Sequence, residues 1–174
     1  MVRRVAYVHG SRQGRDTLEQ RFRFEGQAAN AAAVADVLLN EPMTGDDSVF
    51  GSRPGKETRR TEESWSISGF SPAPGFRFDV DITHRNGDFH VRFTQPDRSA
   101  PYLQGDLLWV ISDEPDGAIL DEQINTQRAL DVVAEPLGGD RPSLRRWLFF
   151  RIGHKQVMQG ATRNIGALLD RRIN

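Results

Sequence analysis

Residues 143–171 read SLRRWLFFRIGHKQVMQGATRNIGALLDR, and no proline interrupts them after Pro142. Ser143 can cap the free N–H groups at the start of a helix, and a proline is tolerated where no helical N–H is needed. The stretch therefore predicts one long terminal helix, which at ~1.5 Å per residue would be about 40 Å long. A helix longer than the width of a small domain must be covered, and the natural partner is the series of strands before it.

One face of this predicted helix is apolar and carries a histidine. Side chains recur along it at steps of three and four residues, the spacing that aligns them in one stripe. Such a stripe favours packing in a core, and it becomes a binding wall only where empty volume lies beside it. The stripe consists of Trp147, Phe150, His154, Met158, Ala161, Ile165 and Leu168.

The composition narrows the class of protein. The chain has 174 residues, no cysteine and a formal net charge of −1. The balanced charge argues against a general nucleic-acid or anionic-membrane surface, and the missing cysteines exclude disulfides, thiolate zinc sites and a cysteine nucleophile. No segment approaches the ~20 apolar residues that span a bilayer, and the basic N-terminus lacks the apolar core of a signal peptide. We therefore expect a cytoplasmic protein.

The first third of the chain predicts strands around one helix. Residues 2–8 alternate weakly, and the sequence HGSRQGR after them indicates a solvated loop. Residues 17–25 alternate cleanly between apolar and polar, which predicts a half-buried strand. The Ala-rich residues 27–39 then predict a compact helix. Residues 43–60 predict a long connection over an opening, with room for one short helical turn.

The second half of the chain predicts a succession of antiparallel strands. Asn86 and Gly87 supply a favoured hairpin turn, and Asp116 with Gly117 indicates a second tight turn. Residues 106–112 read DLLWVIS, which is apolar on both faces and favours a central strand. The predicted strands are residues 62–68, 76–83, 89–94, 106–112 and 118–126, and residues 127–135 form either a further strand or a helical turn.

This order predicts an α+β fold in which a curved antiparallel β-sheet wraps around the long C-terminal helix. A single helix does not fill the concave side of a strongly coiled sheet, so a cavity between them is expected. We expect one domain over residues 16–174, with residues 1–15 as an N-terminal extension or edge strand. The shared inner surface would include Phe22, Trp65, Phe78, Phe93, Trp109, Leu120, Trp147, Phe150 and Met158.

The order of elements resembles the helix-grip superfamily of START-like (SRPBCC) proteins, also called polyketide-cyclase and Bet v 1-like proteins. The resemblance rests on the Ala-rich helix after the strand at residues 17–25, the hairpin at Asn86 and Gly87, and the terminal helix. It implies a hydrophobic pocket between sheet and helix, which relatives use for lipid or polyketide binding, for aromatisation and cyclisation, or for sequestering a toxic small molecule. Fold alone does not choose among these roles.

Three polar residues are candidate catalytic groups. His154 lies on the apolar stripe, where it could act as general acid or base or hydrogen-bond a ligand carbonyl, against the commoner case of a satisfied structural histidine. Glu122 falls on the inward face of its predicted strand and could shuttle a proton to a polarised ketone, but a register shift of one residue would put Asp121 there instead. Arg151 could stack on rings or bind a carboxylate, against a plain surface ion pair.

The candidate ligand-binding residues are apolar, and no cofactor is expected. The four histidines fall in separate elements without a metal-ligand spacing, and no serine lies in a G-x-S-x-G elbow. Gly153 and Gly160, one heptad apart, favour close packing against a strand or a partner helix, which leaves a homodimer open. The candidate walls of the site are Trp65, Phe78, Phe93, Trp109, Trp147, Phe150 and Met158.

Two functions from different classes follow. In the first, the protein binds a hydrophobic, aromatic or polyketide-like small molecule in the cavity, with the three polar residues as its few polar contacts. In the second, it is a biosynthetic enzyme of the polyketide cyclase or aromatase kind, and the same residues perform acid–base catalysis. A third alternative is an interaction module whose concave surface is filled by its own side chains, which a sizeable empty pocket would exclude.

Overall fold

One antiparallel sheet and two helices make up the described part of the protein. The structure, a computed structural model, describes residues 4–13, 17–26, 28–72, 76–95, 104–125 and 153–173. Its elements are β1 (Arg4–Gln13), β2 (Thr17–Glu25), α1 (Ala31–Asn40), β3 (Lys56–Arg60), β4 (Ser64–Phe70), β5 (Phe78–Arg85), β6 (Asp88–Thr94), β7 (Gln104–Glu114), β8 (Gly117–Asn125) and α4 (His154–Ile173).

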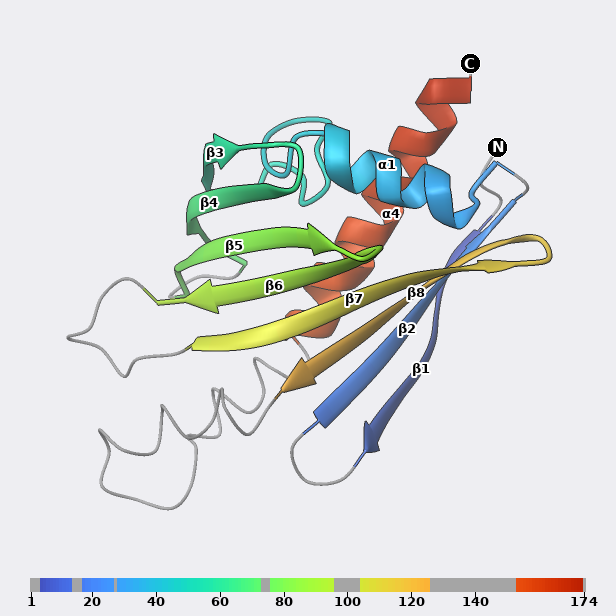
Figure 1. The fold of residues 1–174 in the computed structure, drawn as a ribbon, viewed down its shortest axis with the longest axis horizontal. Coiled ribbons are helices and arrows are strands. Elements are labelled where there is room, and N and C mark those ends of the chain that lie inside the picture. The colour runs from blue at the N-terminus through green and yellow to red at the C-terminus, as the bar shows by residue number, and fades with distance from the viewer. Residues whose placement is uncertain are drawn as a thin grey trace.

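The eight strands form a single sheet in the order β1-β2-β8-β7-β6-β5-β4-β3. Figure 1 shows the sheet curling around α4, while α1 crosses close to α4. This arrangement confirms the predicted α+β class, with a curved antiparallel sheet around the C-terminal helix. Strand β7 lies between β6 and β8, so the expectation that DLLWVIS is central is also confirmed.

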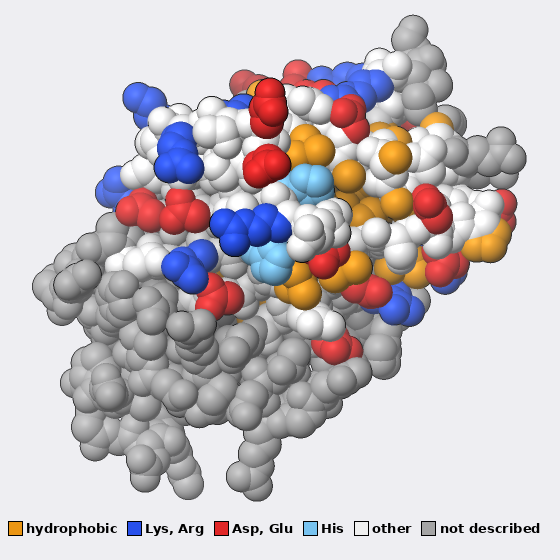
Figure 2. All heavy atoms as spheres, in the orientation of Figure 1, with side chains coloured by type: hydrophobic (Ala, Val, Ile, Leu, Met, Phe, Trp, Pro, Cys, Tyr) orange, Lys and Arg blue, Asp and Glu red, His pale blue; other side chains and the backbone are white. Residues whose placement is uncertain are grey.

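Alternation along the strands separates a buried inner face from a charged outer face. On β2, Gln20, Phe22 and Phe24 are buried, as the sequence pattern predicts. On the outer face Arg21 pairs with Asp121 of the neighbouring strand, with Nε 2.6 Å from Oδ1. Figure 2 shows acidic and basic side chains interspersed over one face of the molecule, in keeping with the balanced net charge.

The two turns differ in how closely they match the prediction. Asn86 and Gly87 join β5 to β6 with φ values of 54° and 87°, the positive dihedrals that this hairpin requires. The second turn is formed by Pro115 and Asp116, one residue earlier than predicted. Gly117 already belongs to β8, and a Cβ there would lie 1.8 Å from the carbonyl oxygen of Phe24, so close strand approach explains this glycine.

The prediction that HGSRQGR forms a solvated loop is wrong over most of its length. Strand β1 continues to Gln13 and pairs antiparallel with β2, with a register shift between Tyr7 and His9. Strand β1 is an edge strand. Edge pairing uses backbone N–H and C=O groups, and a polar side-chain sequence does not reveal it.

The helix and the connection that follow β2 also depart from the prediction. Helix α1 begins at Ala31, because the Asn30 side chain accepts a hydrogen bond from the N–H of Ala33 and caps the helix there. The long connection contains turns but no helical turn, and its last five residues form the edge strand β3. Within it Met43, Val49 and Phe50 are buried in the core.

Helix α4 carries the predicted apolar stripe into the core. Met158, Ala161, Ile165 and Leu168 are all buried. The helix ends at Ile173, and the structure describes it from His154 onward. The predicted earlier part of this helix, residues 143–152, and the ambiguous residues 127–135 lie outside the described residues.

Candidate functional site

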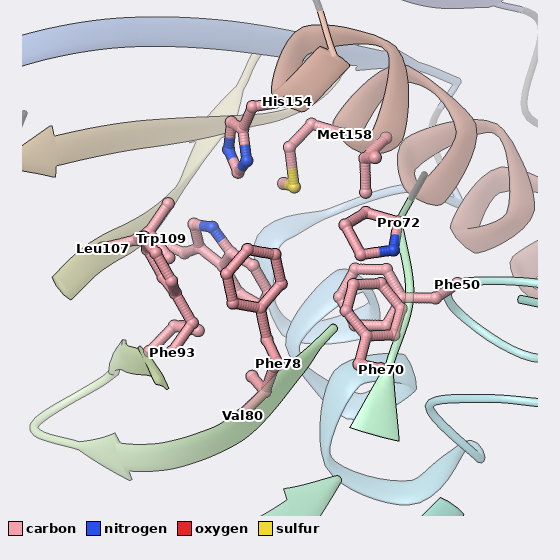
Figure 3. A pocket seen from close by; sticks show the side chains of 12 residues that line it. Phe50, Phe70, Pro72, Phe78, Val80, Phe93, Leu107, Trp109, His154 and Met158 are labelled. Carbon is pink, nitrogen blue, oxygen red and sulfur yellow. The ribbon is translucent and has the colours of Figure 1, made fainter. Parts of the chain in front are cut away.

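A small apolar pocket lies between the beginning of α4 and strands β5, β6 and β7. Its volume is about 60 Å³. Figure 3 shows aromatic rings from the sheet facing the helix across it, with His154 and Met158 descending from α4. The lining residues are Phe50, Phe70, Pro72, Phe78, Val80, Val91, Phe93, Leu107, Trp109, His154, Val157 and Met158.

The aromatic rings of the lining contact one another in two groups. Phe78 and Phe93 meet edge to face with centroids 5.4 Å apart. Phe50 contacts both neighbours, with centroids 5.0 Å from Phe70 and 6.4 Å from Trp109. Rings in such tilted contacts stabilise one another and present broad apolar faces, which suit a flat apolar ligand.

The elements that supply the lining explain how the sequence builds it. Inner-face residues of β5, β6 and β7 form the floor, since every second side chain of a strand points to the same side. Val157 and Met158 follow His154 by three and four positions on α4, so all three present one helical face to the floor. Phe50 belongs to the long connection after α1, in which Val49 and Phe50 form an isolated apolar pair among polar residues.

A buried carboxylate supports His154, the only histidine among the described residues that line this pocket. The Glu122 side chain is 0% exposed and accepts a hydrogen bond from Trp109, with Nε1 2.8 Å from Oε2. Its other oxygen, Oε1, lies 2.9 Å from Nε2 of His154. The three side chains come from β8, β7 and α4, so the pair links the sheet to the start of the helix.

The orientation of β8 settles which acidic residue faces inward. Glu122 points into the interior, whereas Asp121 faces outward and pairs with Arg21. The hydrogen bond to Asp121, followed by its charge, raises the pKa of Arg21. The register that leaves Glu122 inside pairs it with Gln20 of β2 on one side and Trp109 of β7 on the other.

The chemistry of the pair follows from donors and acceptors. An indole N–H only donates, so Oε2 of Glu122 must accept from Trp109. With Nε2 engaged by Oε1, Nδ1 of His154 has no hydrogen-bond partner among the residues described. A carboxylate bound to one imidazole nitrogen orients the ring and sets the role of the other nitrogen, as in hydrolytic triads.

One further polar side chain lies beside this pair. Gln20 is 3% exposed and stands directly opposite Glu122 on the neighbouring strand. Neither atom of its side-chain amide has a hydrogen-bond partner in the part of the chain that is described. Sequence alternation predicts that Gln20 faces inward, but it gave no sign that the amide would be unpaired.

The candidate residues from the sequence divide into three groups. Five of them line the pocket, namely His154, Phe78, Phe93, Trp109 and Met158. Glu122 is not a lining residue but is hydrogen-bonded to His154. The candidates Arg151, Trp147 and Phe150 lie outside the described residues.

Trp65 is buried as expected, but it is not a lining residue of this pocket. It packs edge to face against Phe89, with ring centroids 6.1 Å apart, and the guanidinium of Arg60 lies over its ring. Trp65 lies near the beginning of β4, whereas Phe70 at the end of the same strand lines the pocket, so the two side chains reach different parts of the interior.

Residues that the sequence interpretation missed complete the pocket. Phe70 is the last residue of β4 and Pro72 follows it by two positions, and Leu107 and Val91 are ordinary inward strand positions. Only Phe50 had a usable signal, the apolar pair in a polar connection. Across the described ranges no three potential metal ligands gather, and no helix is long and apolar enough to cross a membrane.

Solved structures share this architecture at low sequence identity. Protein Ms6760 from Mycobacterium smegmatis is 13% identical, with a TM-score of 0.63 over 96% of this chain and 99% of that chain. The di-domain ARO/CYC BexL from the BE-7585A biosynthetic pathway is 11% identical, with a TM-score of 0.56 over 88% of this chain. The di-domain ARO/CYC StfQ from the steffimycin biosynthetic pathway is 13% identical, with a TM-score of 0.51 over 91% of this chain.

These likenesses define the class of fold. The chain has the helix-grip fold, as the resemblance in its element order implied. It spans about half the length of each di-domain protein, covering 50% of BexL and 52% of StfQ. The sequence matches no family model and no curated protein. At such identities the likeness shows the fold alone, so the role of the pocket must be argued from its own residues.

Proposed function

We propose that this protein binds a hydrophobic, aromatic or polyketide-like small molecule in the pocket between α4 and the sheet. The observation that carries the proposal is the lining itself. Among the described residues, five aromatic side chains and several aliphatic ones surround a single polar side chain, His154, which a buried carboxylate holds in place. Ligand sites are typically apolar concavities with a few placed polar groups that fix orientation.

The size of the pocket limits the first ligand to be tested. About 60 Å³ is small beside the roughly 300–1,000 Å³ typical of drug-sized ligands. A single aromatic ring is therefore the natural probe. A ligand with several rings would have to displace a lining side chain, and Phe50 is the best placed to move, since it belongs to a connection and not to a strand.

Methionine methyl NMR provides a site-resolved test. Met158 lines the pocket, whereas Met43 is buried in the core and is not a lining residue, so the two methyl groups serve as reporter and control. Titration with a single-ring aromatic compound such as ethylbenzene should shift the Met158 signal through the ring current and leave the Met43 signal in place. Saturation of the solution with the probe and no movement of Met158, or equal movement of both signals, would refute the proposal.

A second candidate function is acid–base catalysis of the cyclase or aromatase kind. The hydrogen bond between Glu122 and His154 supports it, because proton transfer requires a positioned acid or base beside the ligand. The two functions respond differently to His154→Gln. If the protein only binds, the variant should keep most of its affinity, measured through Met158. If it is a cyclase, turnover of a poly-ketone substrate should be lost while the Met158 shift remains.

A further inference from the structure

We propose that the guanidinium of Arg53 binds a carboxylate of the ligand at the border of the pocket, so that the preferred ligand is an aromatic acid whose ring occupies the apolar lining. The inference rests on the proposed binding function and deepens it by naming the chemical class of the ligand. Arg53 is a half-buried cation beside an apolar pocket, and no carboxylate of the described residues pairs with it.

Arg53 lies where the long connection passes between the end of β4 and helix α4. Its Nη1 donates to the carbonyl oxygen of Phe50 at 2.7 Å, and a Cβ on Gly160 of α4 would lie 3.4 Å from its Nη2. The next residue, Pro54, accepts a hydrogen bond from the N–H of Ser71, directly after β4. The guanidinium is therefore held between the connection and the helix.

The same contacts place Arg53 at the border of the pocket. Phe50 is a lining residue, and so is Val157, which precedes Gly160 by three positions and lies on the same side of α4. Pro72, two residues after the end of β4, lines the pocket as well. Figure 3 shows Phe50 and Pro72 together on one side of the pocket. Arg53 is not itself a lining residue, so a ligand meets it by extending beyond this side.

The charge of Arg53 has no counterpart in the described part of the chain. Other arginines have one, since Arg60 pairs with Glu57 and Arg171 pairs with Asp47. The guanidinium of Arg53 instead donates to a backbone carbonyl. Burial lowers the pKa of Arg53, and no neighbouring charge within the described ranges opposes this effect. An arginine nevertheless stays protonated in proteins, so a partly desolvated cation remains beside the pocket.

The free edge of the guanidinium identifies the group that it binds. With Nη1 engaged by Phe50, the edge formed by Nε and Nη2 has no hydrogen-bond partner among the residues described, and neither atom is enclosed. Arg21 uses this same edge to hold both oxygens of Asp121, at 2.6 and 2.9 Å. Such a charge-assisted pair is about twice as strong as a neutral hydrogen bond. Arg53 therefore offers a two-point site for a carboxylate.

The size of the pocket determines how the ligand is built. A volume of about 60 Å³ holds one ring, so the carboxylate must lie outside the apolar lining. A short chain can carry it from the ring past Phe50 to Arg53. An arylalkanoic acid has these parts in this order, with an apolar ring at one end and the anion at the other.

A series of matched acids and amides tests the ligand class. Benzoate, phenylacetate and hydrocinnamate carry the carboxylate at increasing distance from the ring, and each has an uncharged amide of nearly the same shape. Followed through the Met158 methyl signal, one acid of the series should bind about tenfold more tightly than its amide, as expected for a hydrogen bond to a charged group. If no acid binds better than its amide, the proposal fails and the binding function stands. If acids, amides and ethylbenzene all leave Met158 unmoved, the binding function itself fails.

Two glutamine variants assign the preference to one side chain. Arg53→Gln should abolish the preference for the acid and leave the affinity for the amide in place. Arg59→Gln is the matched control, because it removes the same charge from an exposed arginine of β3 and should keep the preference. A preference that survives in Arg53→Gln, or one that both variants lose equally, would overturn the role of Arg53.

Proton–nitrogen-15 NMR of the unaltered protein provides a test that needs no folded variant, since Arg53 also holds the carbonyl oxygen of Phe50. The Nε–H signal of Arg53 should shift when the preferred acid is added and should stay in place with its amide. Equal responses to the acid and the amide would refute the contact between Arg53 and the carboxylate.

Discussion

The two ends of α4 carry the same apolar stripe but face different surroundings. At its beginning His154, Val157 and Met158 border the pocket above β5, β6 and β7. Toward its end Ile165 and Leu168 are buried in the same hydrophobic core but are not among the lining residues of this pocket. An amphipathic helix therefore does not itself determine whether its apolar face packs in a core or borders a ligand pocket. The element that lies opposite this face determines it.

The long connection and α1 cover the second half of the helix. Asn164 donates from Nδ2 to the carbonyl oxygen of Val49 at 3.1 Å, and Arg171 pairs with Asp47 at 2.8 Å. Arg172 pairs with Asp36 in the middle of α1 and with Glu41 directly after its end. These contacts hold the connection and α1 against the second half of α4, which we call the packed half; the first half, beside the pocket, is the pocket half.

The largest expected effect separates the packed half from the pocket half. Ile165→Ala should lower the free energy of unfolding by about 4 kcal/mol, because it leaves a cavity in a closely packed core. Met158→Ala should cost only about 2 kcal/mol, since Met158 already borders empty space and the change extends an existing pocket. Urea denaturation of both variants measures the difference, and equal losses would remove the distinction between the two halves.

The next largest effect is expected for the hydrogen-bonded pair of Glu122 and His154 at the beginning of α4. His154→Leu should lower the free energy of unfolding by about 3 kcal/mol, because it removes one partner of a buried carboxylate. The double variant His154→Leu with Glu122→Leu should recover most of that loss, since two apolar side chains replace the buried polar pair. Denaturation of the single and double variants measures both changes in the free energy of unfolding. A double variant no more stable than His154→Leu alone would show that the pair is not the source of the loss.

The sequence predicted much of this fold because most of its signals are local. The turn at Asn86 and Gly87 specifies its own hairpin, and the strict alternation from Phe78 to Ile82 specifies which side chains face inward. The stripe on α4 from Met158 to Leu168 likewise needs only the period of a helix. These features depend on residues that are neighbours in the chain.

The remaining features depend on pairings between distant residues. The choice between Glu122 and Asp121 rests on the register of β8 with β2, and Gln20 lies about a hundred positions before Glu122 in the sequence. Alternation predicted that Trp65 faces inward, but the coiling of the sheet decides which part of the interior it reaches. The contact of Phe50 with the pocket depends on how a long connection folds back, which no periodicity describes.

A smaller effect of opposite sign is expected at Gln20, which stands opposite Glu122 on the neighbouring strand. Gln20→Leu should raise the free energy of unfolding by about 1 kcal/mol, because a buried amide without hydrogen bonds is replaced by an apolar side chain of similar size. Gln123→Leu, at an exposed position on β8, is the matched control and should change it by less than about 0.5 kcal/mol. Thermal and urea unfolding measure both. A loss of stability in Gln20→Leu would indicate that the amide has a partner in solution.

The smallest effect tests the connection that covers the packed half. The hydrogen bond from Arg60, with a weaker one from the N–H of Met43, lowers the pKa of Glu57 below its ordinary value of 4.5. Because the folded state lowers this pKa, the ionised carboxylate stabilises the protein fully above pH 4.5, and the contribution is lost as the pH falls further through the folded value.

Glu57→Gln should therefore reduce the loss of stability in acid below pH 4.5. The effect at neutral pH should be under about 1 kcal/mol, since the carboxylate is partly exposed and screened by solvent. Glu62→Gln, an exposed carboxyl in the turn before β4, is the control and should keep the acid dependence of the unaltered protein. Urea denaturation at several pH values from neutral to acid compares the three proteins. If the Glu57→Gln curve follows the other two, this carboxylate does not contribute to the stability of the connection.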